Sequence, residues 1–590
     1  MCGIAGEMTF DGRMASAGAV EAMNTAQAAR GPDGAGLHLH GRVALGQRRL
    51  KIIDLSERAE QPMHDPVLGL TVVFNGCIYN YRELREKLRA LGYQFFSDGD
   101  TEVVLKAFHA WRERAPEQLN GMFAFAVAER DSGRVTLARD RLGIKPLYYA
   151  EGKGHVRFAS TLPALLAAND VDRSIDPVAL NHYLSFHAVV PPPRTILKGV
   201  RKLAPATVRC YEPDGTARER VYWSLSFERG AEDIQRSAEA WGEELLSALR
   251  RAVERRRIAD VPVGVLLSGG VDSSLITALL AQAGHADLRT FSIGFEGAHG
   301  EAGDEFQWSD MIVERFETEH RKIFIESARL IDALPGTVRA MSEPMVSYDN
   351  VAFYLLAQEV AKHVKVVQSG QGADEVFGGY HWYPKLVGSG NPAQDYARAF
   401  MDRDFAAYSA QVSAEYVGLD HARELVEEHM ARSLANDPVD RALHLDTTVM
   451  LVDDPVKRVD NMTMAAGLEA RVPFLDHELV ELAARIPPHQ KLRDGGKGIL
   501  KDVARRVVPA AVIDRPKGYF PVPALKYLEG PFLALARDAL CSRAAKERGI
   551  FRRDYLERLF ADPKAHITPL QGSELWQAAL LELWLQTQEV

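Results

Sequence analysis

The sequence has few cysteines, no excess of positive charge and no long apolar run. Its 590 residues include four cysteines (Cys2, Cys77, Cys210 and Cys541), and none of them forms a CxxC pair. This spacing argues against a structural zinc site and against a disulfide framework. The net charge of −9 argues against a nucleic-acid binder, because such proteins need clustered positive charge. With no signal peptide and no apolar run of about 18 residues, we expect a cytoplasmic protein that does not enter the membrane.

The chain divides into two halves with different patterns. At 590 residues it is too long for a single core, so two or three domains are expected. Residues 1–210 show short strands, turns and a few helices, which predicts an α+β sandwich. Residues 211–237 are polar and irregular and are predicted to form a linker. In residues 238–590, long helices alternate with short β-branched strands and then dominate, which predicts a doubly wound α/β domain with a helical C-terminal part.

Individual elements can be placed in both halves. In the first half, the apolar pattern predicts a helix over 81–91 and strands over 69–74, 124–129 and 135–138. In the second half, it predicts parallel strands over 261–267, 289–295 and 364–367.

A cysteine directly after the initiator methionine is the most informative single feature. Removal of Met1 would leave Cys2 with both a thiol and a free α-amine. The thiol is a strong nucleophile, and the amine, with a pKa of about 7.7–8 in model peptides, can serve as its general base. We therefore interpret Cys2 as a candidate N-terminal nucleophile. The alternative is a chance cysteine at the start of a strand.

Residues 261–274 (VPVGVLLSGGVDSS) predict a phosphate-binding loop between a strand and a helix. The loop offers two glycines, three hydroxyls and one carboxylate, which belong to Gly269, Gly270, Ser268, Ser273, Ser274 and Asp272. Backbone N–H groups of the turn and the helix N-terminus favour an anion, and the carboxylate can hold Mg²⁺. The GK[ST] ending of a Walker A loop is absent. The string resembles the pyrophosphate loop of ATP pyrophosphatases, which cleave ATP between the α and β phosphates.

A second strand end has a similar composition. The strand predicted over 364–367 leads into QSGQGADE at 368–375, a glycine-rich turn followed by an acidic pair. Asp374 is placed to share a Mg²⁺ ion with Asp272, because the carboxyl ends of parallel strands meet at one edge of a sheet. For Asp374 alone, the alternative is a helix cap.

Together, the two halves resemble the asparagine synthetase family of glutamine-dependent amidotransferases over essentially the whole chain. The first half carries MCGIAG, RGPD at 30–33, RRLKIID at 48–54, NGCIYN at 75–80 and DGDTE at 98–102. The second half carries SGGVDSS, FSIGF, SGQGADEVFGGY and LEARVPFLD at 468–476. The resemblance implies an N-terminal-nucleophile glutaminase with an αββα sandwich, followed by an α/β ATP-pyrophosphatase domain similar to adenine nucleotide alpha hydrolases. It also implies ATP and Mg²⁺ as cofactors and glutamine and a carboxylate acceptor as substrates; homodimers are common in this family.

The resemblance assigns roles in the glutaminase half. Cys2 would attack the side-chain amide of glutamine, giving a thioester and releasing ammonia. Asn75 and the backbone N–H of Gly76 would form the oxyanion hole, an interaction worth about 3–4 kcal/mol per donor in acyl-transfer enzymes. Arg49 would bind the α-carboxylate of glutamine, and Asp100 would pair with its α-ammonium.

The resemblance also assigns roles in the synthetase half. ATP would activate the acceptor carboxylate as an acyl-adenylate, leaving pyrophosphate on the loop 268–274. The positions that hold the nucleotide would be Leu267, Ile293, Ser369 and Gly370. Lys497 would face the phosphate and the acyl-adenylate. Ammonia would reach the adenylate through a dry internal channel, which keeps it unprotonated.

Two positions depart from the family pattern. Typical asparagine synthetases have NGEIYN, in which the acid helps to hold the α-ammonium of glutamine; here that position is Cys77. The lost carboxylate predicts glutamine binding weaker by about 1–3 kcal/mol unless another group compensates, and we interpret Cys77 as a small buried filler. The common string SGEG, whose glutamate lies in the acceptor site, has become SGQG with Gln371. Since Gln371 carries no charge, it hints at an acceptor without the cationic amine of free aspartate.

Three further segments are similar to one branch of the family. Residues 181–203, 342–356 and 378–384 resemble the N-acetylglutaminylglutamine amidotransferases. That branch amidates the C-terminal carboxylate of an N-acetylated Gln-Gln dipeptide to make an osmoprotectant. Five aromatic residues would either line a larger acceptor pocket or pack between helices, with packing expected for most of them; these are Tyr348, Phe353, Tyr380, Trp382 and Tyr383.

Three other functions stay open on the sequence. An ordinary asparagine synthetase would tolerate Gln371 and act on aspartate. A tRNA-modifying ATP pyrophosphatase is disfavoured by the acidic charge and by the glutaminase half. A catalytically silent metabolite sensor is disfavoured by the intact Cys2, Asn75, Asp272 and Asp374.

Overall fold

Two antiparallel sheets form the N-terminal half of the protein. The computed structural model describes residues 2–284, 287–297, 303–515 and 528–590. The first sheet has the order β10-β8-β9-β1-β3-β2 and consists of β1 (Cys2–Thr9), β2 (Gly34–His40), β3 (Val43–Arg49), β8 (Tyr148–Gly152), β9 (His155–Ala159) and β10 (Arg201–Lys202). The second has the order β12-β11-β7-β6-β5-β4 and consists of β4 (Met63–Asp65), β5 (Leu70–Ile78), β6 (Gly121–Glu129), β7 (Val135–Arg139), β11 (Thr207–Tyr211) and β12 (Ala217–Val221).

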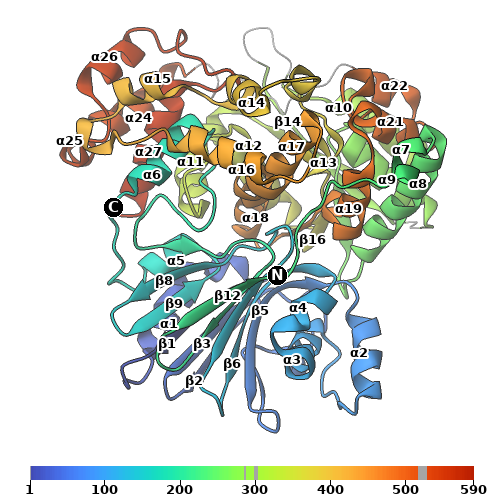
Figure 1. Ribbon diagram of the computed structural model, residues 1–590, viewed down its shortest axis with the longest axis vertical. Coiled ribbons are helices and arrows are strands. Elements are labelled where there is room, and N and C mark those ends of the chain that lie inside the picture. The colour runs from blue at the N-terminus through green and yellow to red at the C-terminus, as the bar shows by residue number, and fades with distance from the viewer. Residues whose placement is uncertain (1, 285–286, 298–302, 516–527) are drawn as a thin grey trace.

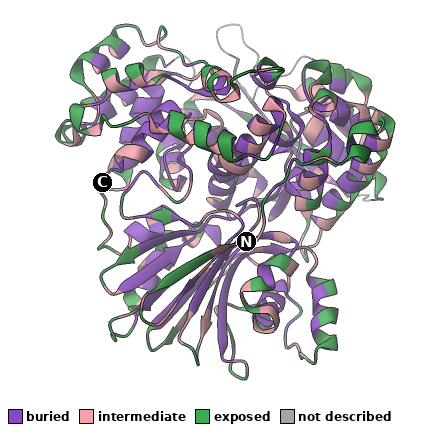
Figure 2. Ribbon diagram, viewed as in Figure 1, coloured by how far each residue is buried: buried purple, intermediate pink, exposed green. Residues whose placement is uncertain are grey.

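The two sheets pack face to face between helices (Figure 1). The helices α1 (Ala17–Ala26) and α5 (Leu162–Leu166) cover the outer face of the first sheet, while α3 (Asp100–Trp111) packs on the second and α2 (Tyr81–Ala90) packs on α3. Because both faces of each sheet are covered, all eight residues of β1 are buried (Figure 2). This arrangement confirms the predicted αββα sandwich.

The strands predicted over 69–74, 124–129 and 135–138 lie almost wholly within β5, β6 and β7, and the helix predicted over 81–91 matches α2.

One predicted boundary needs correction. The range 211–237, predicted as an irregular linker, contains β12 and the short helix α7 (Ala231–Gln235). β12 pairs with β11 at the edge of its sheet and is mostly exposed. An exposed edge strand carries polar residues, and for this reason its composition resembled that of a linker.

A parallel sheet forms the centre of the C-terminal half. Its order is β15-β14-β13-β16-β17, with β13 (Val263–Leu266), β14 (Arg289–Phe295), β15 (Glu319–Ile325), β16 (Val366–Gln368) and β17 (Glu469–Arg471). The strand order reverses between β13 and β16, so the turns that follow these two strands meet at a topological switch point. The main flanking helices are α8 (Ala238–Arg255), α9 (Val271–Gln282), α10 (Phe306–Phe316), α11 (Ser327–Ala340), α12 (Asp349–Val360) and α18 (Lys457–Met464).

Helices make up most of the remaining C-terminal sequence, as predicted. They are α13 (Ala373–Phe377), α14 (Pro392–Phe400), α15 (Phe405–Gln411), α16 (His421–Arg432), α17 (Pro438–Leu445), α19 (His477–Arg485), α20 (Pro488–Lys491), α21 (Gly498–Ala504), α22 (Ala510–Asp514), α24 (Gly530–Cys541), α25 (Arg543–Arg548), α26 (Arg553–Ala561) and α27 (Glu574–Thr587). In the described part of the chain, no helix has the length and apolarity needed to cross a bilayer.

Apolar packing and buried ion pairs join the two halves. One hydrophobic cluster continues from Leu50 and Met122 in the N-terminal half to Trp241 in α8. Next to it, Arg30 and Lys145 of the N-terminal half contact Asp460 of α18 at 2.8 and 3.2 Å, and all three side chains are at most 5% exposed. Charges this deeply buried require close partners, so the two halves have a fixed relative position.

Candidate active sites

Cys2 begins the buried strand β1 and lies opposite Arg49 of β3. Its backbone N–H donates to Oδ1 of Asn75, 3.1 Å away on β5. Because the side chain is only 6% exposed, burial raises the pKa of the thiol. The thiol is therefore protonated at neutral pH and needs a base before it can act as a nucleophile.

Two candidate hydrogen-bond donors lie near Cys2. Asn75 is fully buried, and among the described residues its Nδ2 has no hydrogen-bond partner. On β5, the N–H groups of Phe74 and Ile78 donate to the side chains of Gln61 and Asp100 at 2.7 and 3.0 Å. Because N–H groups alternate between the two edges of a strand, the N–H of Gly76 faces the same edge. This places two donors beside Cys2 that could stabilise an oxyanion.

Arg49 is a buried cation whose guanidinium is fixed by backbone carbonyls. It donates to the carbonyl oxygens of Asp54 and Ser56, the latter at 3.0 Å. Asp100 is the first residue of α3, and its carboxylate accepts the N–H of Ile78. Burial raises the pKa of Asp100 to about 6. Arg49 and Asp100 line the same cavity as Cys2, so they place a cation and a carboxyl group in the cavity that holds the thiol.

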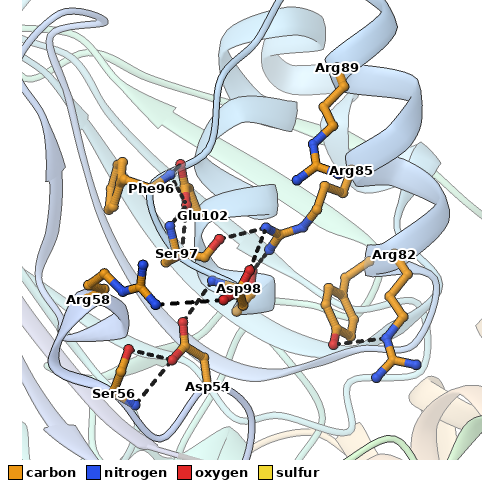
Figure 3. A network of polar contacts seen from close by, with 12 residues as sticks. Asp54, Ser56, Arg58, Arg82, Arg85, Arg89, Phe96, Ser97, Asp98 and Glu102 are labelled. Atoms are coloured by element: carbon orange, nitrogen blue, oxygen red, sulfur yellow. Dashed lines mark hydrogen bonds and ion pairs between the residues drawn. The ribbon is translucent and has the colours of Figure 1, made fainter.

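A polar network fixes the loop that follows Arg49 and the loop that precedes Asp100 (Figure 3). Asp54 accepts the N–H of Asp98 at 2.8 Å, which joins the loop after Arg49 to the loop before Asp100. Arg85 of α2 donates to the carbonyl of Ser97 at 2.6 Å and to that of Gly99. The DGDTE and RRLKIID segments thus form one rigid wall of the cavity.

Two charged residues of this cavity had no role assigned from the sequence. Glu469 and Arg471 of β17, from the other half of the chain, line it together with Cys77. The only sequence signal was their place in the LEARVPFLD motif, which by itself assigned no contact. Cys77 is 1% exposed, and burial raises the pKa of its thiol to about 12. It is a buried neutral group, in agreement with its interpretation as a filler.

The SGGVDSS loop follows β13 and forms a compact turn. The N–H of Ser268 donates to Oγ of Ser273 at 3.2 Å, and the N–H of Gly270 donates to Oγ of Ser268 at 3.3 Å. Gly269 has a φ of +72°, and a Cβ there would lie 2.7 Å from the backbone nitrogen of Ser309. Only glycine fits this position. The turn is thereby held in the shape that precedes a helix N-terminus.

A cavity of about 170 Å³ lies at the switch point between β13 and β16. Most of the nucleotide-site predictions line it, namely Leu267, Ser268, Asp272, Ser273, Ile293, Ser369, Gly370, Gln371 and Asp374. Gly269, Gly270 and Ser274 lie in the same loop but do not line the cavity, and Ser274 is fully buried. The lining residues without a sequence prediction include Glu305, Asp349 and Glu375.

Lys497 lies between the two predicted metal-binding carboxylates. Its Nζ is 2.7 Å from Oδ2 of Asp272 and 2.9 Å from Oδ2 of Asp374. Burial alone would lower the pKa of Lys497, but the two carboxylates outweigh it and raise that pKa above its ordinary value. A Cβ at Gly379 would lie 2.1 Å from Oδ1 of Asp374 and 2.5 Å from Cε of Lys497. Glycine at 379 therefore permits this close arrangement.

The donor set fits a magnesium ion that is shared with phosphate. Mg²⁺ is usually bound by one or two carboxylates together with substrate phosphates, and Asp272 and Asp374 converge on one ammonium group. Among the described residues, no group of three or more histidine, cysteine or acidic side chains could hold a metal on its own. The site therefore suits a metal that arrives with a nucleotide.

The five aromatic residues have different locations. Phe353 and Tyr380 line the cavity. Trp382 and Tyr383 instead donate to the buried carboxylate of Asp446, at 3.0 and 2.7 Å. The hydroxyl of Tyr348 accepts the N–H of Ser573. Two of the five residues thus face the cavity, which agrees with the expectation that most of them pack between helices.

Comparison with known proteins covers both halves. A family model described as "Asparagine synthase" matches residues 244–586, and one described as "Glutamine amidotransferase domain" matches residues 1–223. The chain belongs to the asparagine synthase family. It is a ligase of the amidotransferase type, and its architecture, a glutaminase sandwich followed by an α/β synthetase domain, confirms the predicted fold class.

Curated asparagine synthetases align with most of this chain. The glutamine-hydrolysing asparagine synthetase 1 of Bacillus subtilis is 31% identical over 601 residues, which cover 96% of this chain and 93% of the relative. Asparagine synthetase 3 of the same organism is 32% identical, covering 88% of this chain and 87% of the relative. Asparagine synthetase B of Escherichia coli is 28% identical, covering 83% of this chain and 76% of the relative.

Proposed function

We propose that the protein hydrolyses glutamine at Cys2 and uses the ammonia to amidate a carboxylate that ATP has activated, with N-acetylglutaminylglutamine as the acceptor. One observation carries the proposal. In each half of the protein, the residues predicted to act together line a single cavity. Cys2, Arg49 and Asp100 line the first cavity, and Asp272 and Asp374 line the second.

The first half-reaction uses the groups around Cys2. After removal of Met1, the α-amine takes the thiol proton, and Sγ attacks the amide carbon of glutamine. Nδ2 of Asn75 and the N–H of Gly76 stabilise the oxyanion. The amine then returns the proton to the leaving nitrogen, so that ammonia departs and a thioester remains. Water hydrolyses the thioester to glutamate, which restores the thiol.

The second half-reaction takes place at the loop after β13. A carboxylate oxygen of the acceptor attacks the α-phosphorus of ATP, and pyrophosphate leaves toward the loop 268–274. Mg²⁺ held by Asp272, Asp374 and phosphate oxygens would neutralise charge on the leaving group. Lys497 adds a positive charge at the same place. Ammonia then attacks the acyl carbon, and AMP leaves with the bonding electron pair.

The acceptor proposal is supported by the chemistry of the cavity end that holds Gln371. Burial raises the pKa of Glu375 to about 7 and also raises the pKa of Asp349. Glu375 is therefore only partly ionised near neutral pH, which makes it a poor partner for the cationic amine of free aspartate. Glu375 and the neutral amide of Gln371 suit the N–H and C=O groups of a blocked peptide. Asparagine synthetase activity on aspartate is the second candidate, because the relatives carry that name.

The deciding experiment measures pyrophosphate release from ATP and Mg²⁺ with glutamine and either acceptor. We expect release with N-acetylglutaminylglutamine and an amide product one mass unit lighter than its acid. Release with aspartate alone would contradict the acceptor proposal and identify an asparagine synthetase. A Cys2→Ala variant that still hydrolyses glutamine would contradict the assignment of the nucleophile.

A further inference from the structure

Two carboxylates face the cavity beside Cys2, and they come from different halves of the protein. Asp100 belongs to α3 of the glutaminase sandwich, and Glu469 belongs to β17 of the parallel sheet. They are 6% and 1% exposed. The charge of Glu469 acts on Asp100, on Cys2 and on Cys77, so it lies close to all three.

The charges of the two carboxyl groups differ. Burial and the negative charge of Glu469 raise the pKa of Asp100 to about 6. Burial also opposes ionisation of Glu469, but the positive charge of the chain's N-terminal amine, followed by those of Arg471 and Lys145, lowers its pKa to about 2. Of the two groups, Glu469 is therefore the one that is fully ionised at every pH at which a glutaminase works.

Arg471 fixes the position of Glu469. Nε of Arg471 donates to Oε1 of Glu469 at 2.5 Å. The same guanidinium donates to the carbonyl oxygens of Arg256 and Ile258, at 2.9 and 2.7 Å. Because β17 is also hydrogen-bonded to β16, Glu469 cannot move without the sheet. A carboxylate held in this way is a preorganised partner for a cation.

Free glutamine carries a carboxylate and an ammonium group, and both need partners in a buried pocket. Arg49 is the cation of the cavity that is not paired with Glu469, and Cys77 contributes a neutral thiol. We propose that Glu469, reaching across from the synthetase half, supplies the second carboxylate of the site that binds the α-ammonium of glutamine, beside Asp100 and in place of a charge at position 77. This inference rests on the proposed glutaminase function.

The proposal makes glutamine binding depend on both halves. The N–H of Ser369, which lines the nucleotide cavity, donates to the carbonyl of Arg471 at 2.8 Å. Glu469 begins β17 and Ser369 follows β16, the adjacent parallel strand, so the glutamine pocket contains a residue of a strand that is hydrogen-bonded to the wall of the nucleotide cavity.

The test compares glutamine with 4-carbamoylbutanoate, which has the same amide and carboxylate but no α-amine. Glutamate or ammonia release is measured on the full chain without ATP or acceptor. In Glu469→Gln, we expect kcat/KM for glutamine to fall at least about tenfold, mainly through KM, because a charge-assisted hydrogen bond is lost. For 4-carbamoylbutanoate we expect a change of less than about threefold. Equal losses with both substrates, or no loss with either, would overturn the proposal.

Two further variants separate binding from structure. Glu343→Gln removes another buried acid at the junction of the halves, one that pairs with Lys202 at 2.9 Å and does not line the glutamine cavity; it should leave the ratio of the two kcat/KM values unchanged. Cys77→Glu combined with Glu469→Gln keeps one carboxylate beside Arg471, so it remains informative even if the single variant is unstable. We expect this pair to restore the preference for glutamine, and failure to restore it in a folded protein would count against the proposal.

The outcome is separable from that of the proposed function. If Cys2→Ala retains glutaminase activity, the nucleophile assignment fails whatever the effect at position 469. If Cys2→Ala abolishes activity while Glu469→Gln treats both substrates as the wild type does, only the assignment of Glu469 fails.

Discussion

Replacing Lys497 by methionine should convert the nucleotide site from a nucleotide-dependent metal site into a free-standing one. In the wild type, the ammonium group lies 2.7 Å from Asp272 and 2.9 Å from Asp374, so its single positive charge offsets part of the charge of the two carboxylates. The methionine side chain has a similar length but no charge. The two carboxylates would then face each other, and this arrangement favours a divalent cation even without phosphate.

The size of the effect follows from burial. The side chain of Lys497 is 9% exposed, and those of Asp272 and Asp374 are 21% and 23% exposed. Removing one partner of a buried ion pair lowers the free energy of unfolding by about 3–5 kcal/mol. Because the two carboxylates are partly exposed to solvent, we expect a loss of about 3 kcal/mol. For a site with a Kd of about 1 mM, 10 mM Mg²⁺ would return about 1.4 kcal/mol. With an unfolding entropy of about 2.1 cal/mol/K per residue, this corresponds to a rise of about 2 °C in the Tm of the synthetase domain.

The assay is thermal unfolding with and without MgCl₂, in the absence of ATP. Lys491→Met is the matched control, because Lys491 is also fully buried, and burial lowers its pKa to about 7, but it does not line the nucleotide cavity. We expect a clear Mg²⁺-dependent rise in Tm only for Lys497→Met, together with loss of pyrophosphate release and retention of glutaminase activity. An equal response to Mg²⁺ in the wild type and both variants would refute the reasoning that Asp272 and Asp374 form the metal site.

Three further predictions concern the two cavities. Because burial raises the pKa of Asp100 to about 6 and the α-ammonium favours its ionised form, the Kd of glutamine for Cys2→Ala, measured by calorimetry, should rise about tenfold as the pH falls from about 7 to about 5; a flat profile would contradict this role. Gly379→Ala would place Cβ 2.1 Å from Oδ1 of Asp374, so pyrophosphate release should be lost while glutamine hydrolysis continues. Gln371→Glu should weaken binding of the dipeptide acceptor by about tenfold, through a misplaced charge, in acceptor titrations of pyrophosphate release; unchanged titrations would exclude Gln371 from the acceptor site.

Much of the fold could be predicted because local patterns and tertiary structure agree. The strand–glycine turn–helix order around Gly269 has one favourable geometry, since a φ of +72° against a neighbouring backbone leaves room only for glycine. The same holds for the helix α2, whose apolar positions recur at helical spacing and are buried where the helix packs on α3. In such segments the local structure depends on few contacts with distant parts of the chain, so the sequence pattern predicts it.

The failures have a common physical origin. β12 was taken for a linker because an exposed edge strand has the composition of a loop, and its pairing with β11 is what makes it a strand. β17 contains only the three residues Glu469–Arg471, too few to show a periodicity. Its contribution to the glutamine cavity depends on contacts between segments almost 400 positions apart, at Cys77 and Arg471. No local pattern encodes such a contact.

The position of β17 also bears on how the two reactions are coordinated. The strand contributes Glu469 to the glutamine cavity, and its last residue, Arg471, accepts a hydrogen bond from Ser369 at the nucleotide cavity. Elsewhere between the two halves, Asp460 of α18 is paired with Arg30 and Lys145 of the glutaminase half. A shift of β16 on nucleotide binding would therefore have to move a wall of the glutamine pocket or break buried ion pairs, and the latter costs several kcal/mol. The lower-energy response is for the pocket wall to follow the sheet, which makes affinity for glutamine sensitive to occupancy of the nucleotide cavity.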